Sequence, residues 1–337
     1  MITCKNLSFR YGKRSTDGIQ EINFEAAKNS VHAIIGPSGA GKTTLLKCLS
    51  GDITEYQGEI IFAEKASLGF LKNESLDSAE ETVLNFLLKA ISHSDQEEKD
   101  LNRVRTILSD LELTNEIDSQ LTSLSSGQKQ RLLIAKTLIN NPTVLLLDEP
   151  FANLDNNLRD NLLKEFFALL KDKEITILWV THNTHEALKF SDQILLMQYG
   201  QLEQLATPQV IYYEPKSIFA AQFFGENNIL SARLIDNQDS HIRFELLNSK
   251  WQCSQETQIP YENFLMMIRP EFIYLDKSGP LKGRLVNKYF EGSSTLLELE
   301  CSDSNLVRII HPGVDHTQLN QVYSFNINPQ GFYPLLG

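Results

Sequence analysis

Residues 34–49 read IIGPSGAGKTTLLKCL, and this stretch decides the class of fold. From Gly36 to Thr43 it matches G-x-x-x-x-G-K-[ST] without a gap. Glycines in this pattern let successive backbone N–H groups turn inward, where they can bind phosphate oxygens. The run SVHAII before the motif predicts a buried strand, and TLLKCL after it predicts a helix whose N-terminal end faces the same anion. A chance match in a glycine-rich turn is the alternative, and the flanking strand and helix argue against it.

This phosphate loop carries two groups suited to nucleotide chemistry. Lys42 is placed to reach the β- and γ-phosphates, and the Thr43 hydroxyl is placed to bind Mg²⁺. Tyr11, in LSFRYG, stands where its ring can stack on adenine, although an aromatic in a strand more often belongs to the core. The residues predicted to bind ATP are Tyr11, Gly36, Pro37, Ser38, Gly39, Ala40, Gly41, Lys42, Thr43 and Thr44.

A second stretch, TVLLLDEPFANLD at residues 143–155, places two carboxylates after an apolar run. Val144–Leu147 predict a short buried parallel strand, and open α/β sheets bind ligands at the carboxyl ends of such strands. Asp148 can contribute to the Mg²⁺ site, and Glu149 can orient or deprotonate the water that attacks the γ-phosphate. A solvated Asp-Glu pair is the alternative, and the phosphate loop upstream favours the active-site interpretation.

Between these stretches lies LSSGQKQRLLIAKTLINNP, residues 124–142. With the two motifs around it, this segment resembles the nucleotide-binding subunits of ABC transporters, whose signature is Leu-Ser-Gly-Gly-Gln followed by a polar stretch and Arg. The matching residues are Leu124, Ser125, Ser126, Gly127 and Gln128, with Arg131 after them. A polar turn that only caps a helix is the alternative. The resemblance implies that this segment acts on the γ-phosphate bound by the opposite subunit.

Two further elements follow in the order that the resemblance implies. ANLD resembles the loop that communicates across the dimer, with Asp155 as its acidic residue. WVTHNTHEAL supplies His182 after an apolar strand, where the family places a histidine that contacts the γ-phosphate. The expected catalytic residues are therefore Lys42, Glu149 and His182, whereas His185 is expected to lie on the surface.

The sequence departs from the family pattern at two positions. In LGFLKNESL, Asn73 stands where the family has a glutamine that touches Mg²⁺ and senses the membrane partner. Ser126 stands at a signature position where the family normally has glycine, which matters only if that residue needs a positive φ. Neither change removes the attacking machinery, so a working ATPase that uses ATP and Mg²⁺ is expected.

Composition narrows the class of protein further. The 337 residues carry a formal charge of -12, which argues against nucleic acid as a partner, and the N-terminal residues do not read as a signal peptide. Four scattered cysteines indicate neither a disulfide framework nor a zinc site. No apolar run approaches the roughly 20 residues that span a bilayer.

Two domains are predicted. Residues 1–225 are expected to form an α/β P-loop NTPase domain, of the ABC type by resemblance, with a helical subdomain at about 73–141. Closely spaced β-rich runs indicate a small all-β domain at 226–337. IRPEFIYL and YFEGSSTLLELE within it resemble the OB-like (TOBE) accessory domain of one branch of importer ATPases.

The resemblance implies partners and a place in the cell. One set of motifs per chain implies a head-to-tail dimer with a second copy, two transmembrane permease subunits, and indirectly an extracytoplasmic solute-binding protein. The chain is then expected at the cytoplasmic face of the inner membrane. DEPFANLD, FFGENNIL and IRPEF resemble the branch that imports ferric iron, polyamines, sulfate or phosphonates. Within that branch ferric iron is the expected solute, with polyamine (spermidine or putrescine), phosphonate and sulfate as alternatives. A soluble ABC ATPase without a transport role and a regulatory nucleotide-binding protein are the competing classes.

Overall fold

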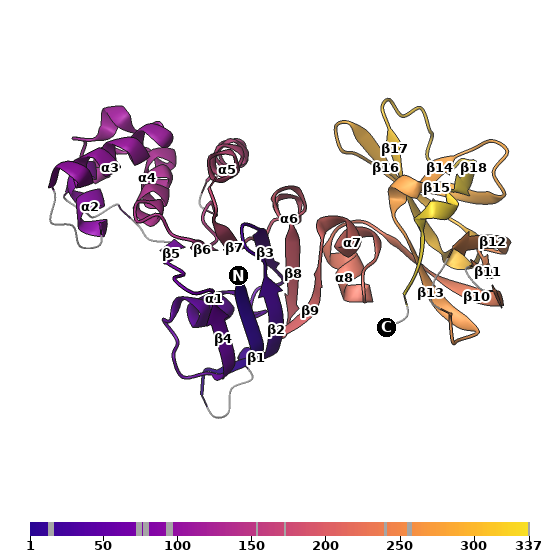
Figure 1. The fold of residues 1–337 in the computed structure, drawn as a ribbon. Helices are drawn as coiled ribbons and strands as arrows, with labels where there is room; N and C mark the ends of the chain where they lie inside the picture. The colour runs from indigo at the N-terminus through magenta and orange to yellow at the C-terminus, as the bar shows by residue number, and fades with distance from the viewer. Residues whose placement is uncertain are drawn as a thin grey trace. The chain divides into compact units, whose positions relative to one another are not determined.

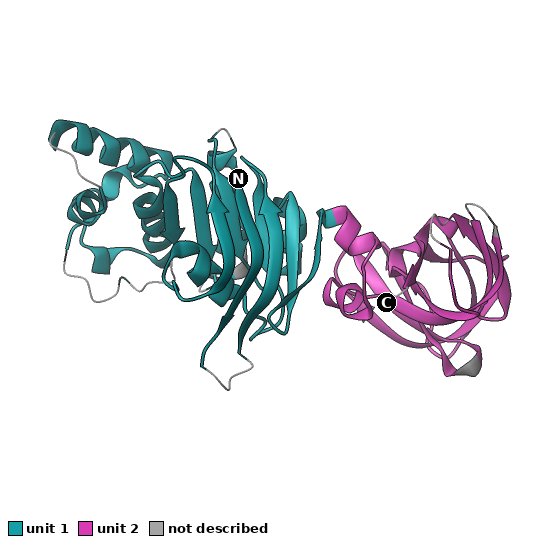
Figure 2. Ribbon diagram, turned by 60° about the horizontal axis from the view of Figure 1, so that its bottom comes forward, with its two compact units in different colours: residues 1–208 teal, residues 209–337 magenta. Residues whose placement is uncertain are grey.

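The structure is a computed structural model, and it describes residues 1–12, 17–71, 76, 81–91, 97–152, 154–171, 173–238, 241–254 and 258–335. Contacts divide the chain into two compact units, residues 1–208 and 209–337, which Figure 2 colours separately. The domain boundary predicted at residue 225 and the subdomain limits of 73–141 stay predictions. Asn73 lies outside the described residues. No helix among the described residues is long and apolar enough to cross a membrane.

Unit 1 is built on a six-stranded sheet in the order β5-β6-β7-β3-β8-β9. All its neighbouring strands are parallel except β8 and β9, which form an antiparallel pair. The strands are β3 (Val31–Ile35), β5 (Leu68–Leu71), β6 (Val144–Asp148), β7 (Thr176–Val180), β8 (Gln193–Gln198) and β9 (Gln201–Ala206). The central strands β3, β6 and β7 are buried along nearly their whole length, which is why their sequences read as unbroken apolar runs.

A second, antiparallel sheet of unit 1 has the order β2-β1-β4. Its strands are β1 (Ile2–Arg10), β2 (Gly18–Ala26) and β4 (Gln57–Phe62). The main core of the unit combines apolar side chains of both sheets with those of α1 (Lys42–Ser50), among them Ile22, Leu45 and Leu178, each fully buried. Burying each such side chain stabilises the fold by about 1.5–3 kcal/mol. This packing fixes the helix that follows the phosphate loop against the sheet.

The remaining helices of unit 1 complete the predicted α/β arrangement. They are α2 (Val83–Ala90), α3 (Glu97–Asp110), α4 (Ser126–Leu138), α5 (Asn156–Leu170) and α6 (Thr184–Phe190), with short 3-10 turns at Thr114–Glu116 and Leu121–Ser123. The helices α2, α3 and α4 pack on one another, and Figure 1 shows them as a group. Val83, Val104 and Leu132 are fully buried. Helices therefore follow one another in the region where the sequence predicts the helical subdomain.

Unit 2 begins with two short helices and continues as an all-β structure. The helices are α7 (Pro208–Tyr213) and α8 (Ile218–Phe223). Two five-stranded sheets follow, with the orders β12-β11-β10-β13-β19 and β14-β18-β15-β16-β17. Their strands are β10 (Asn228–Gln238), β11 (His241–Leu246), β12 (Ser249–Ser254), β13 (Asn263–Ile268), β14 (Ile273–Leu275), β15 (Leu281–Phe290), β16 (Ser294–Glu300), β17 (Leu306–Pro312), β18 (Val322–Ile327) and β19 (Phe332–Leu335). Short 3-10 turns lie at Pro270–Phe272, Ser302–Ser304 and Pro329–Gly331.

The core of unit 2 lies between its two sheets. Apolar side chains from both sheets form one cluster that includes Phe244, Met266, Leu297 and Phe325. Arg269, just after β13, is also fully buried, and its guanidinium donates hydrogen bonds to the backbone carbonyls of Tyr212, Ala221, Gly225 and Glu226. The guanidinium also lies over the Tyr212 ring, 4.1 Å from its centroid. One arginine thus fastens α7, α8 and the segment after them to the β structure.

Candidate nucleotide-binding and catalytic site

The phosphate loop takes a backbone path that a side chain at Gly36 or Gly41 would obstruct. Gly36 has φ +156°, and a Cβ there would lie 2.2 Å from the Met197 carbonyl oxygen. Gly41 has φ +96°, and its Cβ would lie 2.8 Å from Cγ2 of Ile19. Gly41 is also the N-cap of α1, so no side chain caps the first turn of that helix. Its N–H groups are therefore available to an anion at the helix N-terminus.

Lys42 is held inside this loop. The residue is 5% exposed, and its Nζ donates to the carbonyl oxygens of Gly36 at 2.8 Å and Pro37 at 2.9 Å. Burial lowers the pKa of the Lys42 ammonium, while the nearby Glu149 and Asp148 carboxylates raise it. The Lys42 ammonium group now donates to two neutral carbonyls in a buried position. It can exchange them for phosphate oxygens, because a hydrogen bond between two charged groups is stronger than one to a neutral carbonyl.

Tyr11 stands beside the loop and not in the core. It is 51% exposed, its hydroxyl accepts a hydrogen bond from Oγ1 of Thr44 at 3.3 Å, and its ring packs edge-on against Phe9. A hollow of about 340 Å³ opens here. It is lined by Tyr11, Asp17, Gly18, Ser38, Gly39, Ala40, Gly41, Lys42, Thr43, Thr44, Glu149 and His182.

The acidic end of β6 lies against Thr43 of the phosphate loop. Oγ1 of Thr43 donates to Oδ1 of Asp148 at 3.3 Å, so a hydroxyl and a carboxylate oxygen point toward each other although 105 positions separate them. Burial raises the pKa of the Asp148 carboxyl above its usual value, and the hydrogen bond from Thr43 opposes that rise. A hydroxyl and a carboxylate are oxygen ligands of the kind that Mg²⁺ prefers.

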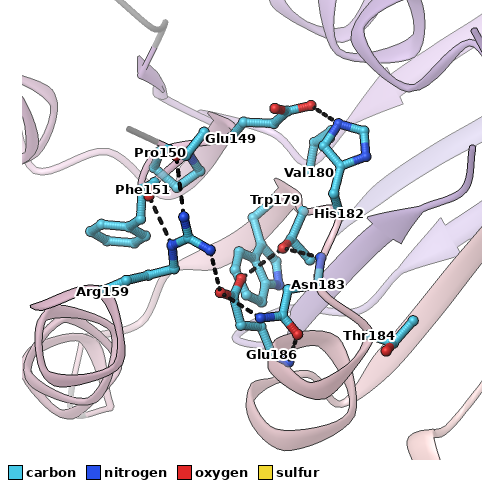
Figure 3. A pocket seen from close by; sticks show the side chains of 12 residues that line it. Glu149, Pro150, Phe151, Arg159, Trp179, Val180, His182, Asn183, Thr184 and Glu186 are labelled. Atoms are coloured by element: carbon cyan, nitrogen blue, oxygen red, sulfur yellow. Dashed lines mark hydrogen bonds and ion pairs between the residues drawn. The ribbon is translucent and has the colours of Figure 1, made fainter. Parts of the chain in front are cut away.

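Glu149 and His182 meet at the edge of the sheet. Glu149 has φ +49°, in the left-handed region, and its N–H donates to the Val180 carbonyl at 3.2 Å. This turn directs the Glu149 carboxylate toward His182, and Oε1 of Glu149 contacts Nε2 of His182, as Figure 3 shows. The Glu149 side chain is 29% exposed and that of His182 is 48% exposed, so both are open to solvent and to a ligand in the hollow.

The signature segment lies apart from this hollow. Ser125 is the N-cap of α4, where its Oγ accepts from the Gln128 N–H at 3.3 Å and its own N–H donates to Oε1 of Gln128 at 2.9 Å. Ser126 is the first residue of α4 and has no positive φ, so serine in place of glycine introduces no left-handed strain there. The residues Leu124 to Gln128 are not among those that line the hollow.

Asp155 caps the neighbouring helix. Its carboxylate accepts from the Leu158 N–H at 3.0 Å, at the start of α5. Two residues that sequence reasoning passed over also lie at this edge, Arg159 on α5 and Glu186 on α6. Each follows a predicted site residue by four positions, Asp155 and His182 respectively. His182 precedes α6 and its N-cap Asn183, so this spacing is not a shared helix face and gave no signal for Glu186.

Comparison with known proteins agrees with this geometry. Residues 19–152 match the family described as "ABC transporter". The spermidine/putrescine import ATP-binding protein PotA of Borreliella afzelii (strain PKo) is 31% identical over 334 residues, which cover 96% of this chain and 93% of that protein. Its namesake from Clostridioides difficile (strain 630) is 33% identical over 329 residues, covering 92% of this chain and 91% of that protein.

A solved structure gives the same result for the fold. The structure of cbiO1 from Clostridium perfringens, part of the ABC transporter complex cbiONQ, has 26% sequence identity and a TM-score of 0.57. The match covers 63% of this chain and 90% of that one.

The chain therefore belongs to the family of ABC transporter ATP-binding proteins. More narrowly, it is the ATP-binding subunit of an importer, and it hydrolyses ATP to power transport. The predicted fold class is confirmed: a P-loop ABC-type α/β unit is followed by an all-β unit with an OB-like arrangement.

Proposed function

We propose that this chain drives import of a polyamine by hydrolysing MgATP. The support for a polyamine is that relatives named for spermidine/putrescine import match 96% and 92% of the chain. The sequence segments alone favoured ferric iron, with polyamine as the alternative. Matches that extend through unit 2 carry more weight than those short segments, because they compare the whole chain.

One observation carries the hydrolytic part of the proposal. A single hollow is lined by Lys42 for the phosphates, Thr43 for the metal ion and Glu149 for the attacking water. Lys42 exchanges the two carbonyls it now bonds for β- and γ-phosphate oxygens. Residues 38–44 supply the surrounding N–H groups, and Tyr11 supplies an exposed ring for adenine. The positive end of α1 adds to the attraction.

Mg²⁺ fits the oxygen pair formed by Thr43 and Asp148. When bound, the ion neutralises the charge of the β- and γ-phosphates. The Thr43 hydroxyl and Oδ1 of Asp148, which are 3.3 Å apart, would both hold the ion as oxygen ligands. We include Asn73 as a further ligand on the resemblance alone.

Glu149 acts as the general base. Its carboxylate accepts the proton of the attacking water, and His182, which contacts that carboxylate, orients it and faces the γ-phosphate. Leu124 to Gln128 act on the nucleotide of a second copy, with Asp155 at the boundary between the two copies. This explains why the signature lies apart from the hollow in one chain.

The same proposal sets the partners and the location. A second copy completes each ATP site, and two permease subunits convert closure of the pair into passage of the solute. A solute-binding protein delivers the polyamine from outside. The chain then lies peripherally on the cytoplasmic face of the membrane.

The test compares the native chain with Glu149→Gln. Purified Glu149→Gln is expected to lose about 10²- to 10⁴-fold in ATP turnover, because the general base is removed, while it still binds ATP. Glu245→Gln, in unit 2, is the matched control, since Glu245 forms an ion pair with Arg233 far from the hollow in sequence. Unchanged turnover in Glu149→Gln would refute the assigned base.

Uptake decides the solute. In cells whose own gene for this protein is deleted, uptake of labelled putrescine and spermidine should be restored by the native chain. The Glu149→Gln variant should not restore it. Loss of ferric-iron uptake with polyamine uptake intact would overturn the polyamine assignment in favour of iron.

A further inference from the structure

The loops that carry Glu149 and His182 are each fixed by a residue that touches neither of these side chains. Arg159 on α5 contacts the loop after Glu149, and Glu186 on α6 contacts the loop around His182 (Figure 3). A cavity of about 500 Å³ separates the loops, and both residues line it.

Arg159 holds the loop after Glu149 through its backbone. Nε donates to the Phe151 carbonyl at 3.0 Å, and Nη2 donates to the carbonyls of Ala152 and Leu154, both at 3.1 Å. Arginine suits this task because its planar fork presents five donors at once. The loop leaves β6 through the left-handed turn at Glu149, so fixing its carbonyls also fixes the direction of the Glu149 side chain.

Glu186 holds the segment on both sides of His182. One carboxylate oxygen accepts from Oγ1 of Thr181 at 2.7 Å, and the other accepts from Nδ2 of Asn183 at 3.2 Å. The Asn183 N–H also donates to Oγ1 of Thr181 at 3.1 Å. Glu186 is only 6% exposed, so these bonds form away from water, where an unpaired carboxylate would be costly.

The two anchoring residues also face each other. Nη1 of Arg159 lies 3.9 Å from Oε1 of Glu186, with side-chain exposures of 21% and 8%. Opposite charges at this distance in a largely buried place attract each other. The Arg159–Glu186 pair therefore links the loop after Glu149 to the loop around His182.

We propose that Arg159 and Glu186 are positioning residues that set the distance between Glu149 and His182 for ATP hydrolysis. This inference rests on the proposed roles of Glu149 and His182. The phosphate loop, residues 36–44, has no part in the Arg159–Glu186 contacts, so ATP binding should depend little on the pair. The pair consequently affects kcat and leaves KM for ATP nearly unchanged.

The experiment measures kcat and KM for ATP, with affinity for a fluorescent ATP analogue and thermal unfolding, in variants of the full chain. Arg159→Ala and Glu186→Gln should each lower kcat by about 10- to 100-fold, because a small displacement of a catalytic group has that effect. KM and analogue affinity should change by less than about 3-fold. Arg159→Lys should recover only part of kcat, since its single nitrogen cannot occupy the positions of both Nε and Nη2.

The double variant gives an independent readout. If the two residues act as a unit, Arg159→Ala with Glu186→Gln should lower kcat no further than the worse single change. Arg103→Ala is the matched control, because Arg103 on α3 also donates to a backbone carbonyl, that of Ile139 at 2.7 Å. It should lower the unfolding temperature without a selective loss of kcat.

The outcomes separate this inference from the proposed function. If Glu149→Gln abolishes turnover while folded Arg159 and Glu186 variants keep native kcat, the positioning role is wrong and the catalytic assignment stands. If Glu149→Gln hydrolyses ATP at the native rate, the catalytic role of Glu149 is wrong, whatever the Arg159 and Glu186 variants show. Equal losses in kcat and analogue affinity would also overturn the positioning role. Where Arg159→Ala does not fold, Arg159→Lys and Glu186→Gln decide the question by the same kcat-to-KM comparison.

Discussion

Lowering the pH should destabilise unit 1 through one buried histidine. His32 lies in the central strand β3 and is 1% exposed. Its Nε2 is 2.8 Å from Oγ of Ser30, and within the described part of the chain its Nδ1 has no hydrogen-bond partner. Burial lowers the pKa of His32 from 6.5 to about 4, although the Asp192 carboxylate partly opposes this. The folded chain therefore keeps His32 neutral under conditions that protonate it in the unfolded chain.

The sign and size of the effect follow from these two pKa values. A depressed pKa in the folded state contributes stability that is complete above pH 6.5 and disappears as pH falls toward 4. Between about pH 7.5 and about pH 5, protonation of His32 favours the unfolded state over the folded state by a factor of about 10^1.5. Each factor of ten corresponds to about 1.36 kcal/mol. The free energy of unfolding should thus fall by about 2 kcal/mol from this residue alone.

Urea unfolding at both pH values measures this change. The chain has two tryptophans, so a Trp251→Phe background leaves Trp179, in the strand next to His32, to report on unit 1. The comparison is with His32→Gln in the same background, which cannot take up the proton. Carboxylates such as Asp148 titrate in both chains, so only the difference between them belongs to His32. Equal pH dependence in the two chains would refute the reasoning.

Two further substitutions test the packing of unit 2 and the shape of the phosphate loop. Arg269→Met should destabilise unit 2 by about 3 kcal/mol, because several carbonyl groups would lose their hydrogen-bond donor. Trp251 fluorescence during unfolding measures this change, and an unchanged unfolding midpoint would contradict it. Gly36→Ala should weaken ATP binding by about 10-fold or more, since its Cβ would meet the Met197 carbonyl at 2.2 Å. Gly39→Ala, whose Cβ meets nothing within 4 Å, should weaken binding less in the same titration.

The sequence was most informative where a chemically important residue lies within a recognisable local pattern. The phosphate loop could be predicted because its glycines, Lys42 and the flanking apolar runs are all local signals. Asp148 could be predicted because the apolar run of β6 ends immediately before it. The β-rich spacing after residue 226 likewise predicted the all-β structure, since strands and turns leave a short-range pattern.

Other features depend on contacts that no local pattern encodes. Arg159 holds backbone carbonyls, which have no sequence signature of their own, and its partner Glu186 lies on another helix. His32 sits in an apolar run that reads as an ordinary buried strand, so its perturbed titration depends on neighbours brought by the fold. The effect of Ser126 could not be judged either, because its φ follows from the start of α4.

The left-handed turn at Glu149 has a consequence for how this protein can evolve. A non-glycine residue with φ +49° is strained, by about 1 kcal/mol, in a conformation that glycine adopts freely. Selection for thermal stability alone would therefore favour glycine at position 149. Replacement by glycine would also remove the carboxylate. Lineages that keep glutamate here retain a local instability that only selection for turnover can maintain.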